Sequence, residues 1–554
     1  MTRTPVMSLN SVEGEEDPLL QVGPVGEQQV DRTTSSVLAR MRAVLHTIEA
    51  EEVQATVAIP HDKEEYFDDK PPAWFSFKKL WAFTGPGFLM SIAYLDPGNL
   101  ESDLQAGAAA GYSLLWVLWW ATVMGLLLQL LAARLGVVTG KHLAQICREE
   151  YPKEATWLLW LMTELAIIGS DIQEVIGSAI AVNILSKGTI PLWGGVLITA
   201  ADTFTFLLLE GYGVRKLEAL FGVLITTMAV TFGVEYIIAE PNQADVMLGL
   251  VVPTLSSSTI QQAVGMVGAV IMPHNIYLHS ALVQSRDVKR DSDVQLKEAN
   301  KYFAIESAIA LLLSFIINLF VVSVFAVGFY GTPEADDIGL HNAGEYLQKQ
   351  YGDFALYIWA IGLLAAGQSS TMTGTYAGQF VMQGFLDLKI ARWKRVLLTR
   401  TIAILPAVVV ALTATDFLDS LDQWLNVLQA VQLPFALVPV LLFTNSSAIM
   451  GKFSNPLIVQ LVTWVLGLGV IAINIYSIIQ AFEVLPQTWW LFAIFVFGGI
   501  LYFAFIIFLI VFVYHAKLRR LLHCLGRPFG CCQAGPDDGQ PEEAQKVTSG
   551  YERT

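Results

Sequence analysis

Two short polar runs interrupt long apolar stretches of the chain and carry the side chains with the clearest chemistry. One run contains Asp96-Pro-Gly-Asn99 and the other contains Met272-Pro-His-Asn275. A proline inside a membrane helix frees backbone carbonyl and amide groups, which lipid cannot satisfy, so such breaks belong beside a cavity or an ion. An aspartate in the same place is costly and marks a functional site. The two runs therefore predict helix breaks beside a buried ion, and the breaks are expected at Pro97, Gly98 and Pro273.

The side chains at the two breaks favour a transition-metal ion. Asp96 offers an anionic oxygen, Asn99 an amide oxygen, and the unwound backbone near Ala269 a carbonyl oxygen. Met272 adds a thioether, a soft ligand that Mg²⁺ and Ca²⁺ do not favour, whereas mixed oxygen and sulfur ligation suits Mn²⁺, Fe²⁺, Co²⁺ or Cd²⁺. A methionine in an apolar helix is usually a packing residue, but Met272 directly precedes a Pro-His-Asn break, and this position favours the ligand role.

A later apolar segment supplies two further candidates for the metal site. Asn426 and Gln429 are three residues apart and share one face of a helix. We expect one of them either to complete the coordination of the ion or to gate access to it.

Titratable residues in other apolar segments predict proton movement. Glu164, Asp171 and Glu174 are spaced by seven and then three residues, which places all three carboxyl groups on one face of a helix. Arg400, deep in a later segment, is expected to balance one of these acids. A purely structural ion pair is the alternative interpretation.

Two histidines follow the second break. His274 and His279 lie within its apolar segment, and histidine titrates near physiological pH, so an intramembrane pair indicates proton transfer. The alternative is a neutral histidine that fills space and makes a hydrogen bond.

The elements that position these residues are membrane helices. Of the 554 residues, 54% are hydrophobic and 15% are charged, whereas soluble domains carry about 25% charged residues. The net charge of −16 argues against a nucleic-acid partner, because a phosphate-binding surface needs a basic excess. Twelve apolar segments reach the roughly 20 residues that a membrane helix needs. They lie at 80–108, 112–138, 155–185, 190–210, 216–239, 260–285, 302–330, 354–385, 394–414, 421–448, 456–481 and 488–515.

Lysine and arginine positions predict how these segments are oriented. Twelve spans place both termini on one side of the membrane, and twenty lysines and arginines fall in the loops and flanks of that side. The opposite loops contain only Lys187 and Lys349. Because positive residues concentrate in cytosolic loops, we expect both termini to be cytosolic.

The positions of the breaks predict the domain organisation. They fall in the first and sixth segments, and interrupted helices at matching places in two halves mark a transporter binding site near the middle of the membrane. Two ordinary proline kinks are the alternative. We expect a disordered cytosolic tail at 1–75, a first repeat at 76–240, a second, inverted repeat at 241–450, two appended helices at 451–517 and a cytosolic tail at 518–554.

The N-terminal tail contains a candidate sorting signal. Glu15-Glu-Asp-Pro-Leu19-Leu20 fits the acidic dileucine pattern that clathrin adaptors bind on cytosolic tails. Patterns this short also arise by chance, but the expected disorder of the tail would make this one accessible.

Taken together, the motifs resemble those of the NRAMP family, the natural resistance-associated macrophage proteins, which are proton-coupled divalent metal transporters. The two break motifs carry the resemblance, and three longer stretches look like the eukaryotic branch: Ala166–Ser178, Ala365–Gln379 and Leu425–Leu437. The similarity covers about residues 80–515.

The resemblance implies an all-α polytopic membrane protein with a LeuT-like 5+5 inverted repeat, broken helices 1 and 6, and two extra C-terminal helices. It implies alternating-access symport of Fe²⁺ or Mn²⁺, and also Co²⁺ or Cd²⁺, with protons into the cytosol across an endosomal, lysosomal, vacuolar or plasma membrane. Such a protein is no enzyme and holds no prosthetic group. Its partners are metal ions, protons and the lipid bilayer.

The resemblance also assigns individual residues. Those matching the metal ligands of the family are Asp96, Asn99, Met272 and the Ala269 carbonyl, with Asn426 as the contact from the tenth helix. Those matching its proton route are Asp171, Glu174, His274 and Arg400.

Proteins of other classes explain the motifs less well. A membrane sensor that binds metal without moving it needs a large output domain, and the tails are too short for one. An amino-acid symporter on the same fold needs small residues where Asp96, Asn99 and Met272 stand. An intramembrane protease needs Gly-x-Gly-Asp or His-Glu-x-x-His, and the chain has neither.

Overall fold

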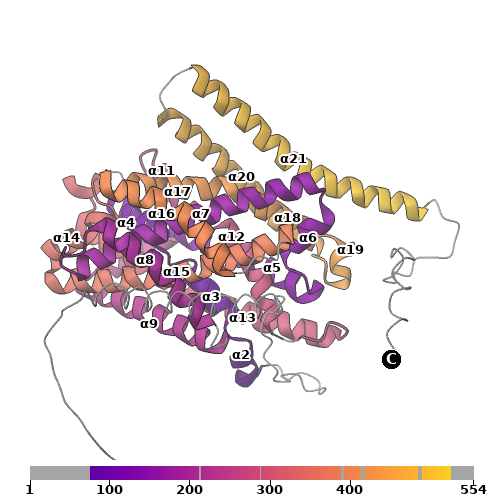
Figure 1. The fold of residues 1–554 in the computed structure, drawn as a ribbon, viewed down its shortest axis with the longest axis horizontal. Coiled ribbons are helices and arrows are strands. Elements are labelled where there is room, and N and C mark those ends of the chain that lie inside the picture. Colours follow the sequence, from indigo (N-terminus) through magenta and orange to yellow (C-terminus); the bar gives the residue numbers. More distant parts are fainter. Residues whose placement is uncertain are drawn as a thin grey trace, which may run out of the picture. The chain divides into compact units, whose positions relative to one another are not determined.

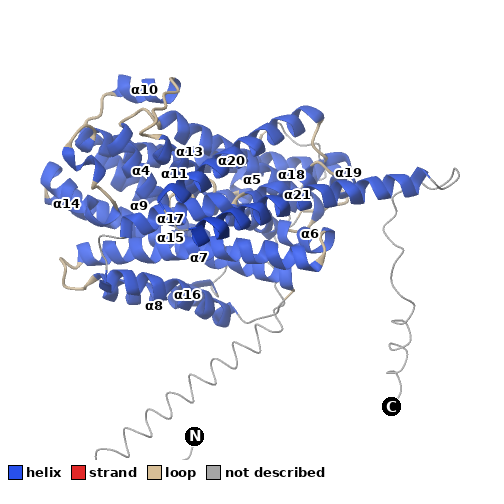
Figure 2. Cartoon of the chain, turned by 90° about the horizontal axis from the view of Figure 1, so that it is seen from above, coloured by secondary structure: helices blue, strands red, loops and turns tan. Residues whose placement is uncertain are grey.

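The computed structural model describes residues 75–210, 214–286, 288–387, 392–413, 418–484 and 489–525. Every regular element within these ranges is a helix (Figure 1, Figure 2). These residues belong to one compact unit, Ala58–Thr554. The candidate sorting residues Glu15, Leu19 and Leu20 lie outside the described residues.

Nine helical stretches among the described residues are long and apolar enough to cross a membrane. They are Leu115–Thr139 (α5), Lys153–Leu185 (α7), Glu218–Ala239 (within α9, Val214–Ala239), Ile260–Ser285, Asp293–Phe329 (α13), Asp353–Leu386 (α15), Leu421–Thr444, Leu457–Tyr476 (within α20, Leu457–Val484) and Val496–Tyr514 (within α21, Trp489–Leu525). Two further predicted segments form helices with shorter apolar parts, α8 (Leu192–Glu210) and α16 (Arg392–Thr413). All eleven coincide with segments predicted from hydropathy.

The remaining predicted segment, the first, is divided into three helices. They are α2 (Phe77–Phe83), α3 (Pro86–Ile92) and α4 (Pro97–Ala110). The sixth is divided into α11 (Ile260–Val270) and α12 (Pro273–Leu282), followed by the short 3₁₀ helix η1 (Val283–Ser285). The tenth is interrupted between α17 (Leu418–Gln432) and α18 (Pro434–Thr444). The helix breaks predicted in the first and sixth segments are therefore present.

Each break lies just before the proline that predicts it. Pro97 and Pro273 are the first residues of α4 and α12, a position where the missing N–H costs nothing and the fixed φ suits a helix. Gly98 is helical, and a Cβ on it would lie 2.7 Å from the side chain of Gln173 on α7. This glycine therefore serves close packing against α7 and not the break itself.

Short helices cover the two ends of the spans. We call one end of the spans the outer end; it carries α10 (Gln243–Val251), α14 (Leu340–Tyr351) and the short 3₁₀ helix η2 (Pro333–Asp336). We call the opposite end the inner end; it carries α2 and α6 (Leu143–Glu150). α14 is capped from inside the bundle, because Glu101 Oε2 accepts a hydrogen bond from the Leu340 amide at 2.5 Å. α19 (Ser447–Met450) and the 3₁₀ helix η4 (Gly451–Phe453) connect α18 to α20.

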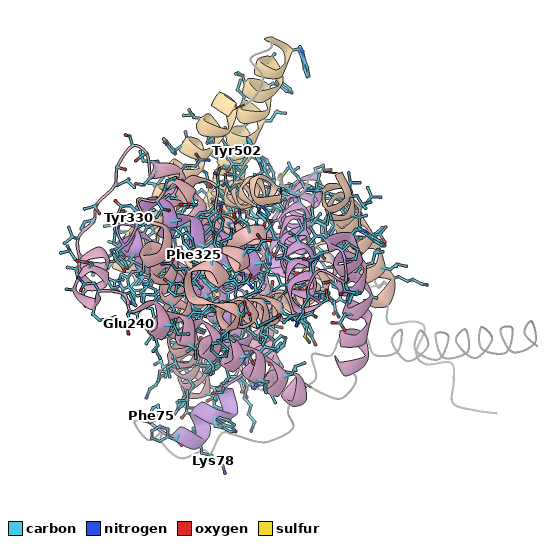
Figure 3. The ribbon with its side chains drawn as sticks, turned by 90° about the vertical axis from the view of Figure 1, so that its left-hand side faces the viewer. Phe75, Lys78, Glu240, Phe325, Tyr330 and Tyr502 are labelled. Carbon is cyan, nitrogen blue, oxygen red and sulfur yellow. The ribbon has the colours of Figure 1, made fainter. Side chains whose placement is uncertain are left out.

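The two C-terminal helices pack on one part of the bundle. α20 contacts α17 and α18, and α21 contacts α18 (Figure 1). Tyr502 of α21, labelled in Figure 3, donates a hydrogen bond to the Val431 carbonyl at 2.9 Å, and its ring centroid lies 5.3 Å from that of Phe435. Their other faces are exposed and apolar, as lipid contact requires.

Polar contacts fasten the inner end of the first segment, where Phe75 and Lys78 lie (Figure 3). The buried Arg286 donates to the carbonyls of Ala82, at 3.1 Å, and Thr84, at 2.9 Å. Its guanidinium also pairs with Glu218 of α9 at 2.7 Å. We call this group of contacts the Arg286 latch. It joins the end of α2 to α9 and to the residue that follows η1.

Candidate metal centre

The first break presents two unused oxygen atoms. Asp96 caps α4, where its Oδ1 accepts hydrogen bonds from the Asn99 amide at 2.8 Å and from the Asn99 side chain at 2.7 Å. Both residues are 1% exposed. Asp96 Oδ2 and Asn99 Oδ1 are buried and have no hydrogen-bond partner. A carboxylate and an amide oxygen without partners, held by one short turn, are suited to binding a cation.

The second break presents a methionine and a carbonyl. Met272 has an extended backbone between α11 and α12, and its side chain is 2% exposed. The carbonyl of Ala269 lacks its helical partner because that partner is residue 273, and proline has no N–H. Ala269 is fully buried. The break thus offers one thioether and one free carbonyl oxygen.

A direct hydrogen bond joins the two breaks. Asn275 of α12 donates through Nδ2 to the Ala93 carbonyl at 3.4 Å. Ala93 is the residue whose helical partner would be Pro97, so this bond satisfies the carbonyl freed by the first proline. The helices on the outer side of the breaks, α4 and α11, also pack together. The predicted ligands therefore come from adjacent chain segments.

α17 contacts both breaks through Asn426. Its Nδ2 donates to the Gly98 carbonyl at 3.3 Å, and a Cβ on Gly268 would lie 2.9 Å from the Asn426 carbonyl oxygen. Its Oδ1 accepts from Gln173 of α7 at 2.9 Å. Gln429 in turn donates to Gln173 Oε1 at 2.7 Å. Asn426 and Gln429, both predicted, are thus joined at the centre through one glutamine.

Gln173 was not predicted from the sequence. It is fully buried and links α7, α17 and the first break. A signal was present, because Gln173 lies two residues after Asp171 and so on the opposite face of the same helix. Polar residues on two faces of one membrane helix indicate two separate polar contacts.

α13 supports the first break with three polar side chains that were not predicted from the sequence. Glu306 Oε1 accepts from the amides of Gly85 at 2.5 Å and Gly87 at 3.0 Å. Ser314 donates to the Ser91 carbonyl at 2.8 Å, and Asn318 donates to the Tyr94 carbonyl at 2.9 Å. The signal was their spacing of eight and then four residues in an apolar segment, which places them on one face.

The predicted acids of α7 face α15. A Cβ on Gly374 would lie 3.0 Å from Asp171 Oδ1 and 3.4 Å from Glu174 Oε1, so both carboxyl groups border one glycine. Glu174 Oε1 accepts from Ser170 at 3.1 Å and from Ser370 of α15 at 2.7 Å. Glu164 is also buried, further toward the inner end of the helix.

The other predicted proton residues lie on neighbouring helices. His274 and His279 are buried on α12, which packs against α5, α7 and α15. His279 Nε2 lies 3.5 Å from Ser307 Oγ of α13. Arg400 lies in α16, which packs against α7. Its side chain is outside the described residues.

The candidate metal centre differs in composition from most protein metal sites. Across the ranges that the structure describes, no group of three or more His, Cys, Asp and Glu side chains is arranged to hold a metal. The predicted ligands instead combine one carboxylate with neutral oxygen and sulfur donors. Such a set would suit an ion that is bound and then released, because fewer anionic ligands bind a cation less tightly.

The described residues form only helices, and two broken membrane spans meet at their breaks, which is the architecture of a transporter of the LeuT-like 5+5 class. The sequence model for natural resistance-associated macrophage protein-like proteins (Nramp) matches residues 87–480. The chain belongs to the Nramp family.

Relatives and a solved structure agree with this assignment. The chain is 66% identical over 428 residues to the metal transporter nramp1 homolog of Dictyostelium discoideum, which covers 77% of this chain and 80% of that protein. It is 58% identical over 443 residues to metal transporter Nramp4 of Arabidopsis thaliana, covering 78% and 86%. A crystal structure of the Eremococcus coleocola manganese transporter superposes with a TM-score of 0.73 at 31% identity, covering 84% of this chain and 99% of that one. These relatives are metal transporters and not enzymes.

Proposed function

We propose that this protein is a proton-coupled symporter that moves Mn²⁺ or Fe²⁺, and also Co²⁺ or Cd²⁺, into the cytosol by alternating access. The observation that carries the proposal is the pair of buried, unbonded oxygen atoms, Asp96 Oδ2 and Asn99 Oδ1, beside the second break. A buried carboxylate oxygen without a hydrogen-bond partner is costly, and binding a cation offsets that cost. The manganese transport named for the Eremococcus relative supports the same class of cargo.

In this proposal, Asp96, Asn99, Met272 and the Ala269 carbonyl bind the metal. Asn426 completes the shell once its Oδ1 exchanges the hydrogen bond from Gln173 for the ion. The thioether supplies the preference for transition metals over Ca²⁺ and Mg²⁺.

The proton route in this proposal uses different residues. Asp171 and Glu174 receive the proton, Glu164 lies on the same helix toward the inner end, and Arg400 is the balancing charge. His274 and His279 connect this helix to the metal centre from α12. Support comes from the burial of the carboxyl and imidazole groups and from their placement on packed helices.

We also propose that both termini are cytosolic and that the protein resides in endosomal, lysosomal or vacuolar membranes or in the plasma membrane. The lysine and arginine distribution supports the orientation. If clathrin adaptors bind the dileucine, changing Leu19 and Leu20 to Ala should shift the protein to the plasma membrane, as measured by surface biotinylation. Continued residence in endosomes would show the motif to be accidental.

The test is Mn²⁺ uptake into proteoliposomes that contain a pH dye, for the wild type and Asp96→Ala. A symporter acidifies the lumen during uptake, and both signals should fall at least tenfold in Asp96→Ala. Asp353→Asn, at the exposed start of α15, is the matched control and should keep both. Uptake without acidification would contradict the proton route but keep the metal centre. Binding of Mn²⁺ without any uptake would favour the alternative, a metal-binding membrane sensor.

A further inference from the structure

Two polar residues lie about two helical turns outside the metal centre, one on each broken helix. Asp103 follows Asp96 by seven residues on α4, and Gln262 precedes Ala269 by seven residues on α11. Seven residues of α-helix rise about 10 Å and turn through nearly two full revolutions. Each residue therefore lies on the same helix face as a predicted metal ligand, displaced toward the outer end.

Contacts between the helices indicate that Asp103 and Gln262 lie on the same side of the contact between α4 and α11. α4 and α11 meet at Ser102 and Gly265, since a Cβ on Gly265 would lie 3.8 Å from Ser102 Oγ. α17 lies on one side of this contact, where Gln423 donates to Gln105 of α4 at 3.0 Å.

The angular positions of Asp103 and Gln262 around their helix axes place both residues on the side of the α4–α11 contact that is opposite α17. Asp103 is about 200° from Gln105 around α4. On α11, Gly268 faces Asn426 of α17, and Gln262 is about 120° from Gly268. Both residues therefore point away from α17, on the side where α13 packs against α4.

The oxygen atoms of these residues have no partners. Asp103 is 1% exposed, and its Oδ2 makes no hydrogen bond. Gln262 Oε1 is also buried and unbonded, as is Asn99 Oδ1, one helical turn closer to Asp96. No ion pair among the described residues involves Asp103. An unpaired carboxylate and amide oxygens at this depth are costly unless a ligand uses them.

We propose that Asp103 and Gln262 form an outer cation subsite, where a divalent metal ion binds before it moves inward to Asp96. The inference rests on the proposed transport function and adds one binding site to the path of the ion. Asn99 lies between the two positions and offers an oxygen to an ion in transit.

The chemistry of the subsite differs from that of the metal centre. It offers carboxylate and amide oxygens but no sulfur, and hard oxygen donors accept Ca²⁺ as readily as Mn²⁺. Its two protein ligands leave most of the ion's shell to water, so binding is weak. The subsite therefore concentrates divalent ions, and selection for transition metals happens at Met272.

The first test measures binding and does not depend on transport. Mn²⁺ binding is followed by electron paramagnetic resonance on the purified full chain. Asp96→Ala should retain one weak Mn²⁺ site that Ca²⁺ displaces at similar concentration. Asp96→Ala with Asp103→Asn should lose it, whereas Asp96→Ala with Asp245→Asn, an exposed acid on α10, should keep it. The proposal is overturned if Asp96→Ala binds no Mn²⁺, or if its residual binding survives Asp103→Asn.

The second test measures uptake. Asp103→Asn should raise the Mn²⁺ concentration for half-maximal uptake at least about fourfold, because that is the effect of one charge about 10 Å from a divalent ion even at the dielectric constant of water. The maximal rate should change little, and Asp103→Glu should stay near wild type. An unchanged half-saturating concentration in folded Asp103→Asn protein contradicts the subsite. If the wild type takes up no Mn²⁺, the transport proposal fails, while the binding experiment still decides the subsite.

Discussion

At the scale of single residues, the two prolines determine which backbone atoms are available to an ion. Pro97 and Pro273 each leave one carbonyl without its helical partner. The carbonyl of Ala93 receives the Asn275 side chain at 3.4 Å, whereas no side chain of the described residues donates to the Ala269 carbonyl in a hydrogen bond of this kind. The two breaks are therefore chemically unequal, and only the second leaves a backbone carbonyl available to an ion.

The thioether of Met272 can be tested by its effect on selectivity. Met272→Ala should keep Mn²⁺ uptake but admit Ca²⁺ and Mg²⁺, because removing the soft donor leaves only oxygen ligands. Competition of Ca²⁺ against Mn²⁺ in proteoliposomes measures the change, which we expect to exceed tenfold. Met90→Ala, a substitution of another fully buried methionine on α3, is the control for lost volume. If both variants discriminate equally between Mn²⁺ and Ca²⁺, the sulfur of Met272 does not explain the selectivity.

The role of Asn426 can be separated from that of Gln173. If Asn426 binds the ion directly, Asn426→Ala should weaken Mn²⁺ binding more than Gln173→Ala, since Gln173 would act on the ion indirectly, through its hydrogen bond to Asn426 Oδ1 at 2.9 Å. Calorimetric titration of the two single variants and the double variant gives the coupling. If the two single variants lose the same binding free energy for Mn²⁺, and the double variant loses no more than either, both residues only position the first break.

At the scale of elements, α13 acts as a scaffold for the unwound part of the first span. Its side chains satisfy backbone groups that lipid cannot reach. Asn318→Ala removes the donor to the Tyr94 carbonyl, and an unsatisfied buried acceptor costs about 1–3 kcal/mol. The free energy of unfolding in mixed micelles should fall by that amount. Ile316→Ala, on the exposed face of the same helix, should cost less, and an equal loss would contradict the scaffold role.

The Arg286 latch predicts how the inner end opens. If transport proceeds by alternating access, the α2–α3 segment must separate from α9 and η1, and the latch opposes this separation through the three hydrogen bonds from Arg286 to Ala82, Thr84 and Glu218. Arg286→Gln should therefore increase the labelling rate of a cysteine placed at Met90, in a chain whose four native cysteines are serines. Lys452→Gln, which breaks an exposed ion pair with Asp293, is the control. Unchanged labelling in Arg286→Gln would show that other contacts hold the segment.

At the scale of the whole molecule, the distribution of charge predicts one orientation. A peptide tag inserted at the exposed Gly331, in the connection after α13, should be reached by antibody only from the lumenal or extracellular side. Tags at either terminus should be reached only after permeabilisation. Labelling of the Gly331 tag from the cytosol would contradict the orientation and the predicted direction of transport.

The helical class, the segments and the two breaks could be predicted from the amino-acid sequence alone. Hydrophobic runs favour helices in lipid, because every backbone polar group then finds a partner within its own segment. Mid-membrane prolines with polar neighbours favour breaks over ordinary kinks, because the freed backbone groups then have polar surroundings. The family, and with it the fold, followed from motifs as local as Asp96-Pro-Gly-Asn99.

Which residues from distant segments contact the two breaks could be learned only from the packing of the helices. Four of these residues are single polar residues in apolar helices: Gln173, Glu306, Ser314 and Asn318. Their spacing predicts the side of the helix on which they lie, but it does not predict which other helix packs against that side. The neighbour depends on how helices far apart in the chain pack. For the same reason, Asp103 and Gln262 gain meaning only once α4 and α11 are seen side by side, which no pattern within either segment specifies.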